Sequence, residues 1–183
     1  MTLTGLEEQI KSCRACPLHE TRLNAVPGEG NDKAQVFVIG EAPGAKEDEA
    51  GEPFVGRSGS KLNEALESIG LDRINVFISN LVKCRPPKNR NPKDSEIDIC
   101  SDYLFSQISL VRPKVLLTLG KFSSNCLLGT NRSMSQIRGS IFHIHVDGAE
   151  VFVVPTYHPA ATLYNKKLEP LFFEDFQTIK SLL

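Results

Sequence analysis

The sequence has 183 residues, of which 40% are hydrophobic, and it carries 21 Lys and Arg residues against 22 Asp and Glu residues. This length and apolar content fit a single domain over residues 1–183, because domains usually span about 50 to 250 residues. A net charge of -1 excludes a strongly basic protein, so any affinity for a polyanion has to come from a local cluster of charge.

The first residues, MTLTGLEEQIKSC, are too acidic and polar for a secretion signal. No apolar run in the sequence approaches the ~18 residues that a membrane helix requires. We therefore expect a cytoplasmic protein that does not associate with membranes. The surface pattern requires nothing larger than a monomer.

Short apolar segments alternate with helical patterns along the chain. We predict strands at residues 35–39, 75–79, 115–119 and 151–154, and helices at residues 60–69, 94–110, 122–128 and 171–182. Strands that are apolar at nearly every position are typical of a parallel sheet covered by helices on both faces. Residues 141–146 and the Asp-Gly pair that follows them predict a hairpin leading into the last strand. The pattern predicts a three-layer α/β/α sandwich around a four-stranded, mainly parallel sheet.

Four of the five cysteines fall into two groups along the chain: Cys13 with Cys16, and Cys84 with Cys100. Thiolates are preferred ligands of zinc and of iron-sulfur clusters, and a CxxC loop supplies two of them from one turn. In a reducing compartment clustered cysteines bind metal more often than they form disulfides. We predict a four-cysteine metal site, and the spacing does not separate zinc from iron and sulfur. The alternative is a set of unrelated buried thiols, which is how we interpret Cys126 in its apolar run.

Polar residues follow the predicted strands where each one ends. Ligands of open α/β sheets bind beyond the carboxyl ends of the strands. The GEAPG turn at residues 40–44 lets backbone amides approach a planar ligand and puts Glu41 at the mouth of a pocket. Asn80 offers an acceptor and donors side by side, as the edge of a pyrimidine requires, and His158 adds an imidazole at the same end of the sheet. Each residue alone also fits a structural role in a turn or a cap.

The segment KCRPPKNRNPK at residues 83–93 contains five basic residues, three prolines and no acid. Prolines keep a segment extended and outside the interior of a sheet. The result is a rigid basic loop that could neutralise phosphates or could be merely solvated. The acidic stretch at residues 47–52 is expected to face water.

Six features in order along the chain carry a family resemblance: CxxCPL at Cys13, GEAPG at Gly40, GEPFVGRSG at Gly51, NLVKCRPPKNRNP at Asn80, Cys100, and HPAA at His158. With these features the sequence resembles the family 4 uracil-DNA glycosylases, the iron-sulfur branch of their superfamily, from Cys13 to about Pro170. The resemblance implies the uracil-DNA glycosylase fold and a [4Fe-4S] cluster bound by Cys13, Cys16, Cys84 and Cys100. It also implies a DNA repair enzyme that flips uracil out of single- or double-stranded DNA and hydrolyses its N-glycosidic bond.

The resemblance assigns roles to individual residues in the substrate site. Gly40, Glu41, Ala42 and Pro43 would line the site, and Phe54 would stack on the flipped uracil. Asn80 would read the O4 and N3 edge of the base. His158 would donate to O2 as negative charge develops on the leaving base. Ala42 stands where other branches have a carboxylate or an amide for the water, so Glu41 is the nearest ionisable candidate.

DNA would be held by the basic loop, through Lys83, Arg85, Lys88 and Arg90, and by the segment after His158. In that segment Leu163 would fill the space that the base leaves. Family members commonly have an Arg after the corresponding leucine, and this sequence has Tyr164. The abasic product would pass to downstream repair enzymes.

Two alternatives to this function stay open. One is a related glycosylase that accepts a broader set of deaminated bases. The other is a non-enzymatic nucleic-acid-binding module with a structural metal, in which GEAPG, Asn80 and His158 would have no purpose.

Overall fold

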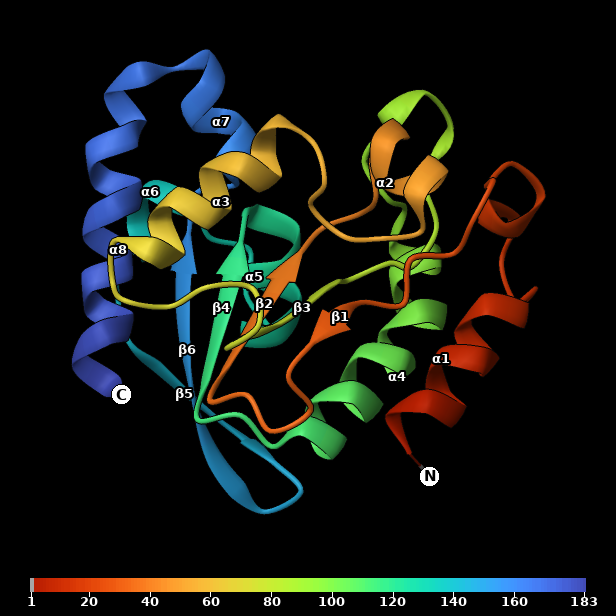
Figure 1. The fold of residues 1–183 in the computed structure, drawn as a ribbon, viewed down its shortest axis with the longest axis horizontal. Helices are drawn as coiled ribbons and strands as arrows, with labels where there is room; N and C mark the ends of the chain where they lie inside the picture. The colour runs from red at the N-terminus through yellow and green to blue at the C-terminus, as the bar shows by residue number, and fades with distance from the viewer. Residues whose placement is uncertain (1) are drawn as a thin grey trace.

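The structure is a computed structural model that describes residues 2–183 (Figure 1). Its helices and strands are α1 (Leu3–Ser12), η1 (Pro17–Glu20), β1 (Glu29–Gly30), β2 (Val36–Gly40), α2 (Ala45–Ala50), α3 (Arg57–Glu67), β3 (Phe77–Asn80), η2 (Pro87–Asn89), α4 (Asp94–Val111), β4 (Val115–Leu119), α5 (Lys121–Leu128), α6 (Met134–Ile137), β5 (Phe142–Val146), β6 (Ala149–Thr156), α7 (Pro159–Tyr164), η3 (Lys166–Leu168) and α8 (Glu169–Leu182). No helix within these residues is long and apolar enough to cross a membrane.

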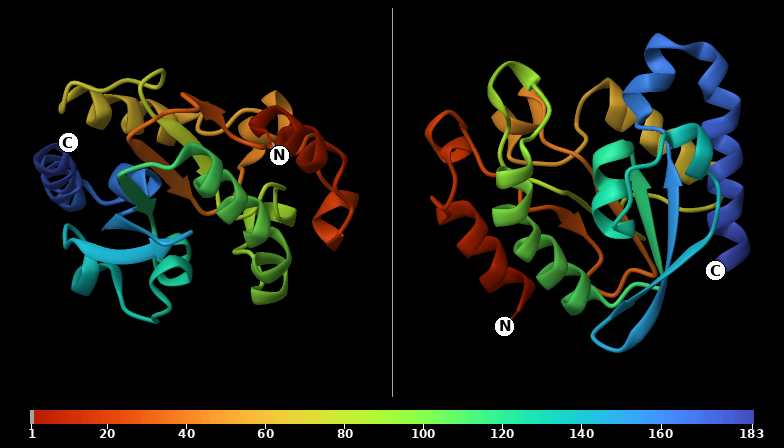
Figure 2. Two further views of the ribbon diagram at one scale, coloured as in Figure 1. Left: turned by 90° about the horizontal axis from the view of Figure 1, so that it is seen from below. Right: turned by 180° about the vertical axis from the view of Figure 1, so that it is seen from behind.

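The centre of the molecule is a six-stranded sheet with the order β1-β3-β2-β4-β6-β5. The four inner strands are parallel to one another, whereas β1 and β5 pair antiparallel at the two edges. Helices α3 and α8 cover one face, and α4 and α5 cover the other (Figures 1 and 2). The predicted three-layer sandwich with a parallel centre is confirmed, and the two edge strands extend the sheet from four strands to six.

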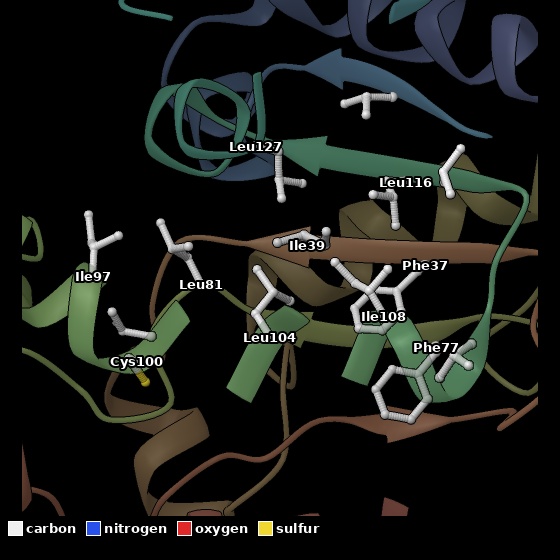
Figure 3. Close-up of a cluster of buried hydrophobic side chains, with 14 of the residues drawn as sticks. Phe37, Ile39, Phe77, Leu81, Ile97, Cys100, Leu104, Ile108, Leu116 and Leu127 are labelled. Atoms are coloured by element: carbon white, nitrogen blue, oxygen red, sulfur yellow. The ribbon is translucent and has the colours of Figure 1, made fainter. Parts of the chain in front are cut away.

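The two sides of the core follow from the alternation of side chains along each strand. Phe37 and Ile39 of β2 contact Leu104 and Ile108 of α4 on one face, as Figure 3 shows. Val38 points to the other face and packs with the residues of α3 and α8. Successive side chains of a strand point to opposite faces, so an unbroken apolar run is buried only when both faces are covered.

Helix α1 was not predicted from the sequence. Thr2 caps it by accepting a hydrogen bond from the backbone N–H of Gly5, at 3.2 Å. Its apolar stripe is narrow and consists of Leu6 and Ile10, which pack in a small cluster with Tyr103 of α4. The helix therefore carries the first cysteine pair to the side of α4.

The carboxyl ends of the parallel strands meet at one edge of the sheet, near α2 and α7 (Figure 1). From β2 the chain reaches β3 on one side through α2 and α3, and from β3 it crosses through α4 to β4 on the other side. This reversal between β2 and β4 is a topological switch point, where ligands of open α/β sheets bind. The loops that follow β2, β3, β4 and β6 therefore surround one location.

Candidate active site

A pocket of about 430 Å³ lies at this carboxyl edge. It is lined by Phe54, Asn80 and His158, which come from three segments far apart in the sequence. Glu41, Ala42 and Pro43 of the turn after β2 line it as well. The volume falls within the range of about 300–1,000 Å³ that is typical of small-molecule sites. The structure thus brings together the residues that follow the strands.

Asn80 is the last residue of β3, and its side chain is almost fully buried. Its Oδ1 atom has no hydrogen-bond partner among the residues that the structure describes. A Cβ atom at Gly40 would overlap this oxygen and would lie 2.6 Å from Cζ of Phe54. The absence of a side chain at Gly40 therefore lets the carboxamide and the aromatic ring lie against β2. A buried acceptor without a partner costs about 1–3 kcal/mol, and a ligand that donates to it removes this cost.

Phe54 forms a wall of the pocket and adopts a backbone conformation with φ = 53°. Such a left-handed conformation costs a residue with a side chain roughly 1–2 kcal/mol. The guanidinium of Arg73 holds the loop by donating to the carbonyl of Phe54 at 3.1 Å and to that of Pro53 at 2.6 Å. The ring of Phe54 is stacked on the imidazole of His158 at a centroid distance of 5.7 Å and an interplanar angle of 30°. A planar ligand would meet an aromatic face that is already fixed.

His158 is the N-cap residue of α7, and its Nδ1 atom accepts a hydrogen bond from the backbone N–H of Ala160 at 3.2 Å. Nδ1 is thus an acceptor, so the proton of the neutral ring is on Nε2. Burial lowers the pKa of His158 to about 4, although the carboxylate of Glu47 acts in the opposite direction. At neutral pH the side chain is an uncharged imidazole with an Nε2–H donor.

Glu41 is the first residue after β2, and its carboxylate is held in the pocket wall. Its Oε1 atom accepts a hydrogen bond from the backbone N–H of Phe122 in the first turn of α5, at 3.1 Å. A Cβ atom at Gly120 would collide with this carboxylate, so the chain at Gly120 passes directly over it. Burial raises the pKa of Glu41. The carboxylate therefore caps α5 in addition to lining the pocket.

Glu47 lines the pocket and was not predicted as a site residue. Its carboxylate accepts hydrogen bonds from the backbone N–H groups of Gly44 at 3.1 Å, Val55 at 3.1 Å and Gly56 at 3.2 Å. It thereby ties the turn after β2 to the loop that carries Phe54. The expectation that residues 47–52 face water is wrong for Asp48, which is 2% exposed, whereas Glu47 is half-buried. The signal available in the sequence was a glutamate three residues after Gly44, a position from which its carboxylate can accept from the backbone N–H at the start of α2.

The basic loop reaches the pocket through Arg90 and Asn89. Both terminal nitrogens of Arg90 donate hydrogen bonds to the carboxylate of Glu96, at 2.9 and 2.6 Å. Arg85 donates a hydrogen bond to Oδ1 of Asn89 at 2.8 Å. Two further basic side chains of the loop, Lys88 and Lys93, are exposed. The loop therefore forms a rim of the pocket and presents at least two basic side chains to solvent.

Lys83 does not belong to this surface, and its predicted contact with DNA needs correction. Its side chain is 1% exposed, and its ammonium is bonded inside the protein. Burial lowers its pKa to about 7. A buried amine cannot neutralise a phosphate at the surface.

Leu163 and Tyr164 are the last two residues of α7, and they differ in exposure. Leu163 is partly buried in α7. Tyr164 is 92% exposed and is part of the pocket lining. The most accessible apolar side chain at the pocket rim is therefore the tyrosine.

The cysteines Cys13, Cys16, Cys84 and Cys100 line a second, apolar hollow, and all four are free thiols. Arg22 donates a hydrogen bond to the sulfur of Cys84 at 2.9 Å, and the backbone N–H of Lys83 donates to that of Cys100 at 3.3 Å. Within residues 2–183 no group of three or more His, Cys, Asp and Glu side chains is arranged to hold a metal ion. Four thiols around one hollow, with donors directed at two of the sulfurs, are the chemical donor set of a zinc site or of an iron-sulfur cluster.

Comparisons with known proteins cover nearly the whole chain. The family model described as the uracil DNA glycosylase superfamily matches residues 27–179. A type-4 uracil-DNA glycosylase of Sulfurisphaera tokodaii is 45% identical, with 99% of this chain and 84% of the relative aligned. Proteins of the same description from Archaeoglobus fulgidus and Thermotoga maritima are 43% and 39% identical, with 99% and 97% of this chain and 93% of each relative aligned. The family model spans the residues that line the pocket, and the aligned part of the Sulfurisphaera relative spans the four cysteines as well.

Proposed function

Because the chain belongs to the type-4 branch of the uracil DNA glycosylase superfamily, we propose that it removes uracil from DNA by hydrolysing the N-glycosidic bond. The substrate is uracil in single- or double-stranded DNA, and the products are free uracil and an abasic site. The reaction starts base excision repair, so enzymes that act on abasic sites follow it. In a duplex the uracil has to leave the stack first, at a cost of a few kcal/mol.

The observation that carries this proposal is the unpartnered Oδ1 of Asn80 in the wall of the pocket. Uracil presents an N3–H donor beside its O4 acceptor. Asn80 accepts from N3–H through Oδ1 and donates to O4 through Nδ2. Cytosine presents the opposite order, an acceptor at N3 and an amino donor at C4. It would leave buried polar groups unpaired at about 1–3 kcal/mol for each group, so it is rejected.

Phe54 and His158 act on the two remaining features of the base, its face and its O2 edge. Phe54 stacks on the ring, a contact worth ~1–3 kcal/mol for a nucleobase on an aromatic side chain. His158 donates its Nε2–H to O2 as the bond to the sugar breaks and negative charge collects on the base. A neutral donor held in place by Ala160 needs no rearrangement at that moment, and fixed donors of this kind commonly supply the largest part of catalysis.

Glu41 has a supporting role in this reaction. Its carboxylate is engaged by the backbone of Phe122, so it holds the turn after β2 against α5 and orients the substrate or the water rather than serving as a free base. The water approaches the sugar at the mouth of the pocket, where Asn89 and Arg90 form the rim. Exposed Lys88 and the neighbouring Arg85 contribute to the phosphate contacts.

Cys13, Cys16, Cys84 and Cys100 hold a [4Fe-4S] cluster that ties the first helix to the loop between β3 and α4. Four thiols that line one apolar hollow are the ligand set that such a cluster would need, and the resemblance to the iron-sulfur branch favours a cluster over a single zinc ion. The protein is then brown, with broad visible absorbance that is lost when the cluster is removed.

The test measures excision from a labelled oligonucleotide that contains one uracil, as a single strand and as a duplex. Asn80→Ala and His158→Ala are expected to lose most of the single-turnover rate with the visible absorbance retained. Asn125 provides the matched control, because its Oδ1 is also buried without a partner in the described chain but lies outside the pocket. Asn125→Ala is expected to keep the wild-type rate. A wild-type protein that binds the oligonucleotide without releasing uracil would leave only the nucleic-acid-binding alternative.

A further inference from the structure

We propose that Lys83 is a positioning residue that links the four-cysteine site to the side chain that reads the base, Asn80. This inference rests on the proposed function and deepens it. It assigns a buried lysine, which has no surface role, to the uracil-reading step.

The ammonium of Lys83 makes three internal hydrogen bonds. Nζ lies 2.6 Å from Oγ of Ser79, 2.7 Å from the backbone carbonyl of Asn80 and 2.7 Å from Oε1 of Gln107. In the protonated side chain three donors therefore meet three acceptors, and every N–H of the ammonium is used. Taking an ammonium out of water costs several kcal/mol unless such partners are present. Breaking the hydrogen bonds between Lys83 and the end of β3 would leave a buried charge without partners, which costs several kcal/mol.

The partners of Lys83 are themselves fixed from elsewhere in the chain. The hydroxyl of Ser79 donates to the carbonyl of Pro27 at 2.8 Å, and Nε2 of Gln107 donates to the same carbonyl at 2.7 Å. The network therefore joins the segment before β1, the end of β3 and the middle of α4. Hydrogen-bond networks in a buried, low-dielectric setting rigidify the groups that they connect.

The backbone of Lys83 belongs to the cysteine site. Its N–H donates to the sulfur of Cys100 at 3.3 Å, and Cys84 is the next residue in the chain. Its carbonyl accepts from the backbone N–H of Val26 at 2.7 Å. One residue thus has its main chain against the sulfurs and its side chain on the carbonyl of Asn80. A shift of the main chain at the cysteine site would be transmitted to the peptide group of Asn80, whose carboxamide must face the base.

The test uses Lys83→Met, which keeps the length of the side chain and removes the three donors. We expect the single-turnover excision rate to fall at least tenfold and inhibition by free uracil to weaken by a similar factor. Affinity for an oligonucleotide without uracil, iron content and visible absorbance should stay at wild-type values. Lys114→Met is the matched control, because Lys114 is exposed and directly precedes β4, at the amino ends of the parallel strands and away from the pocket. It should leave all of these quantities unchanged.

A double-mutant cycle separates positioning from general destabilisation. If Lys83 acts through Asn80, then Lys83→Met adds less than twofold to the loss in an Asn80→Ala background. Gln107→Leu removes one partner, leaves the ammonium two acceptors, and should show a smaller loss with the same non-additivity. If Lys83→Met fails to fold, Gln107→Leu takes its place in the same measurements. Losses that multiply in the Asn80→Ala background, or unchanged inhibition by free uracil, would overturn the inference while leaving an active wild type and its proposed function intact. A wild type that excises no uracil would instead refute the proposed function.

Discussion

One methyl group at Gly40 is enough to test how the base is read. In Gly40→Ala the new Cβ would overlap Oδ1 of Asn80 and lie 2.6 and 2.8 Å from two ring carbons of Phe54. Both side chains must move, because real Cβ atoms do not approach other atoms so closely. Loss of the Asn80 contact leaves a buried N3–H unpaired at about 1–3 kcal/mol, and weaker stacking costs ~1–3 kcal/mol more. Since about 1.4 kcal/mol is a tenfold change in rate, the combined loss of about 2–6 kcal/mol should lower kcat/KM by roughly 30-fold to 2 × 10⁴-fold.

The assay for Gly40→Ala is single-turnover excision at several enzyme concentrations, with thermal unfolding measured on the same preparations. Gly5→Ala is the matched control, because its Cβ would lie 3.4 Å from Oγ1 of Thr2 and far from the pocket, in α1. The control should keep wild-type activity. A Gly40→Ala protein with wild-type kcat/KM would refute the packing of Asn80 and Phe54 against β2 as the basis of recognition.

Three further predictions concern stability, pH and the rim of the pocket. His158 has a folded-state pKa of about 4 against 6.5 in an unfolded chain, so the unfolded state takes up a proton first as the pH falls. Relative to His158→Gln, the wild type should therefore lose up to roughly 3 kcal/mol of stability between about pH 6.5 and pH 4. Urea unfolding of both proteins over this range measures the difference. If the free energies of unfolding of the two proteins change with pH in parallel, the ring is not buried. Arg138→Met leaves the fully buried Asp175 with only the Thr156 hydroxyl as partner. The free energy of unfolding, measured in urea, should therefore fall by about 3–5 kcal/mol. A fall below about 1 kcal/mol would contradict the pairing. Tyr164→Ala should raise KM for uracil-containing DNA about tenfold, because the exposed aromatic ring at the pocket rim can stack on a neighbouring base. Tyr164→Phe keeps the ring and should keep the wild-type KM. If only Leu163→Ala raises KM, the leucine fills the space that the base leaves.

The centre of the fold could be predicted from the sequence because its signals are local. The runs around Val38 and Leu117 are apolar at nearly every position, and only a sheet covered on both faces buries all of them. The edge strand β1 has no such signal, since its pairing involves two residues, Glu29 and Gly30, and depends on their position beside β3. Helix α1 packs against α4, which is distant in the sequence, and its narrow apolar stripe gave no period to recognise. Elements of this kind are determined by tertiary contacts.

In the candidate site, too, the residues with a local sequence signal were predicted and those placed by tertiary contacts were not. Asn80 is the last residue of its strand and His158 comes just after β6, and the rule that ligands bind beyond the strand ends was enough to predict that they lie together. Lys83 was assigned to the surface because its neighbours in the sequence are basic, but the chain turns at this point so that its side chain enters the core while Lys88 stays in solvent. Glu47 was assigned to solvent because its neighbours are acidic, yet three backbone amides bind it. Composition averages over a segment, whereas burial is decided for each side chain.

The residues proposed to contact the base are each held by a segment other than their own. The loop of Phe54 is fixed by Arg73 and Glu47, the end of β3 is fixed by Lys83, and Glu41 is fixed by the first turn of α5. None of these contacts exists before the sheet and its helices have formed, so the pocket has no independent local stability. Excision activity should therefore disappear together with the global fold during unfolding rather than earlier, unless the four-cysteine site opens first and releases the end of β3 through Lys83.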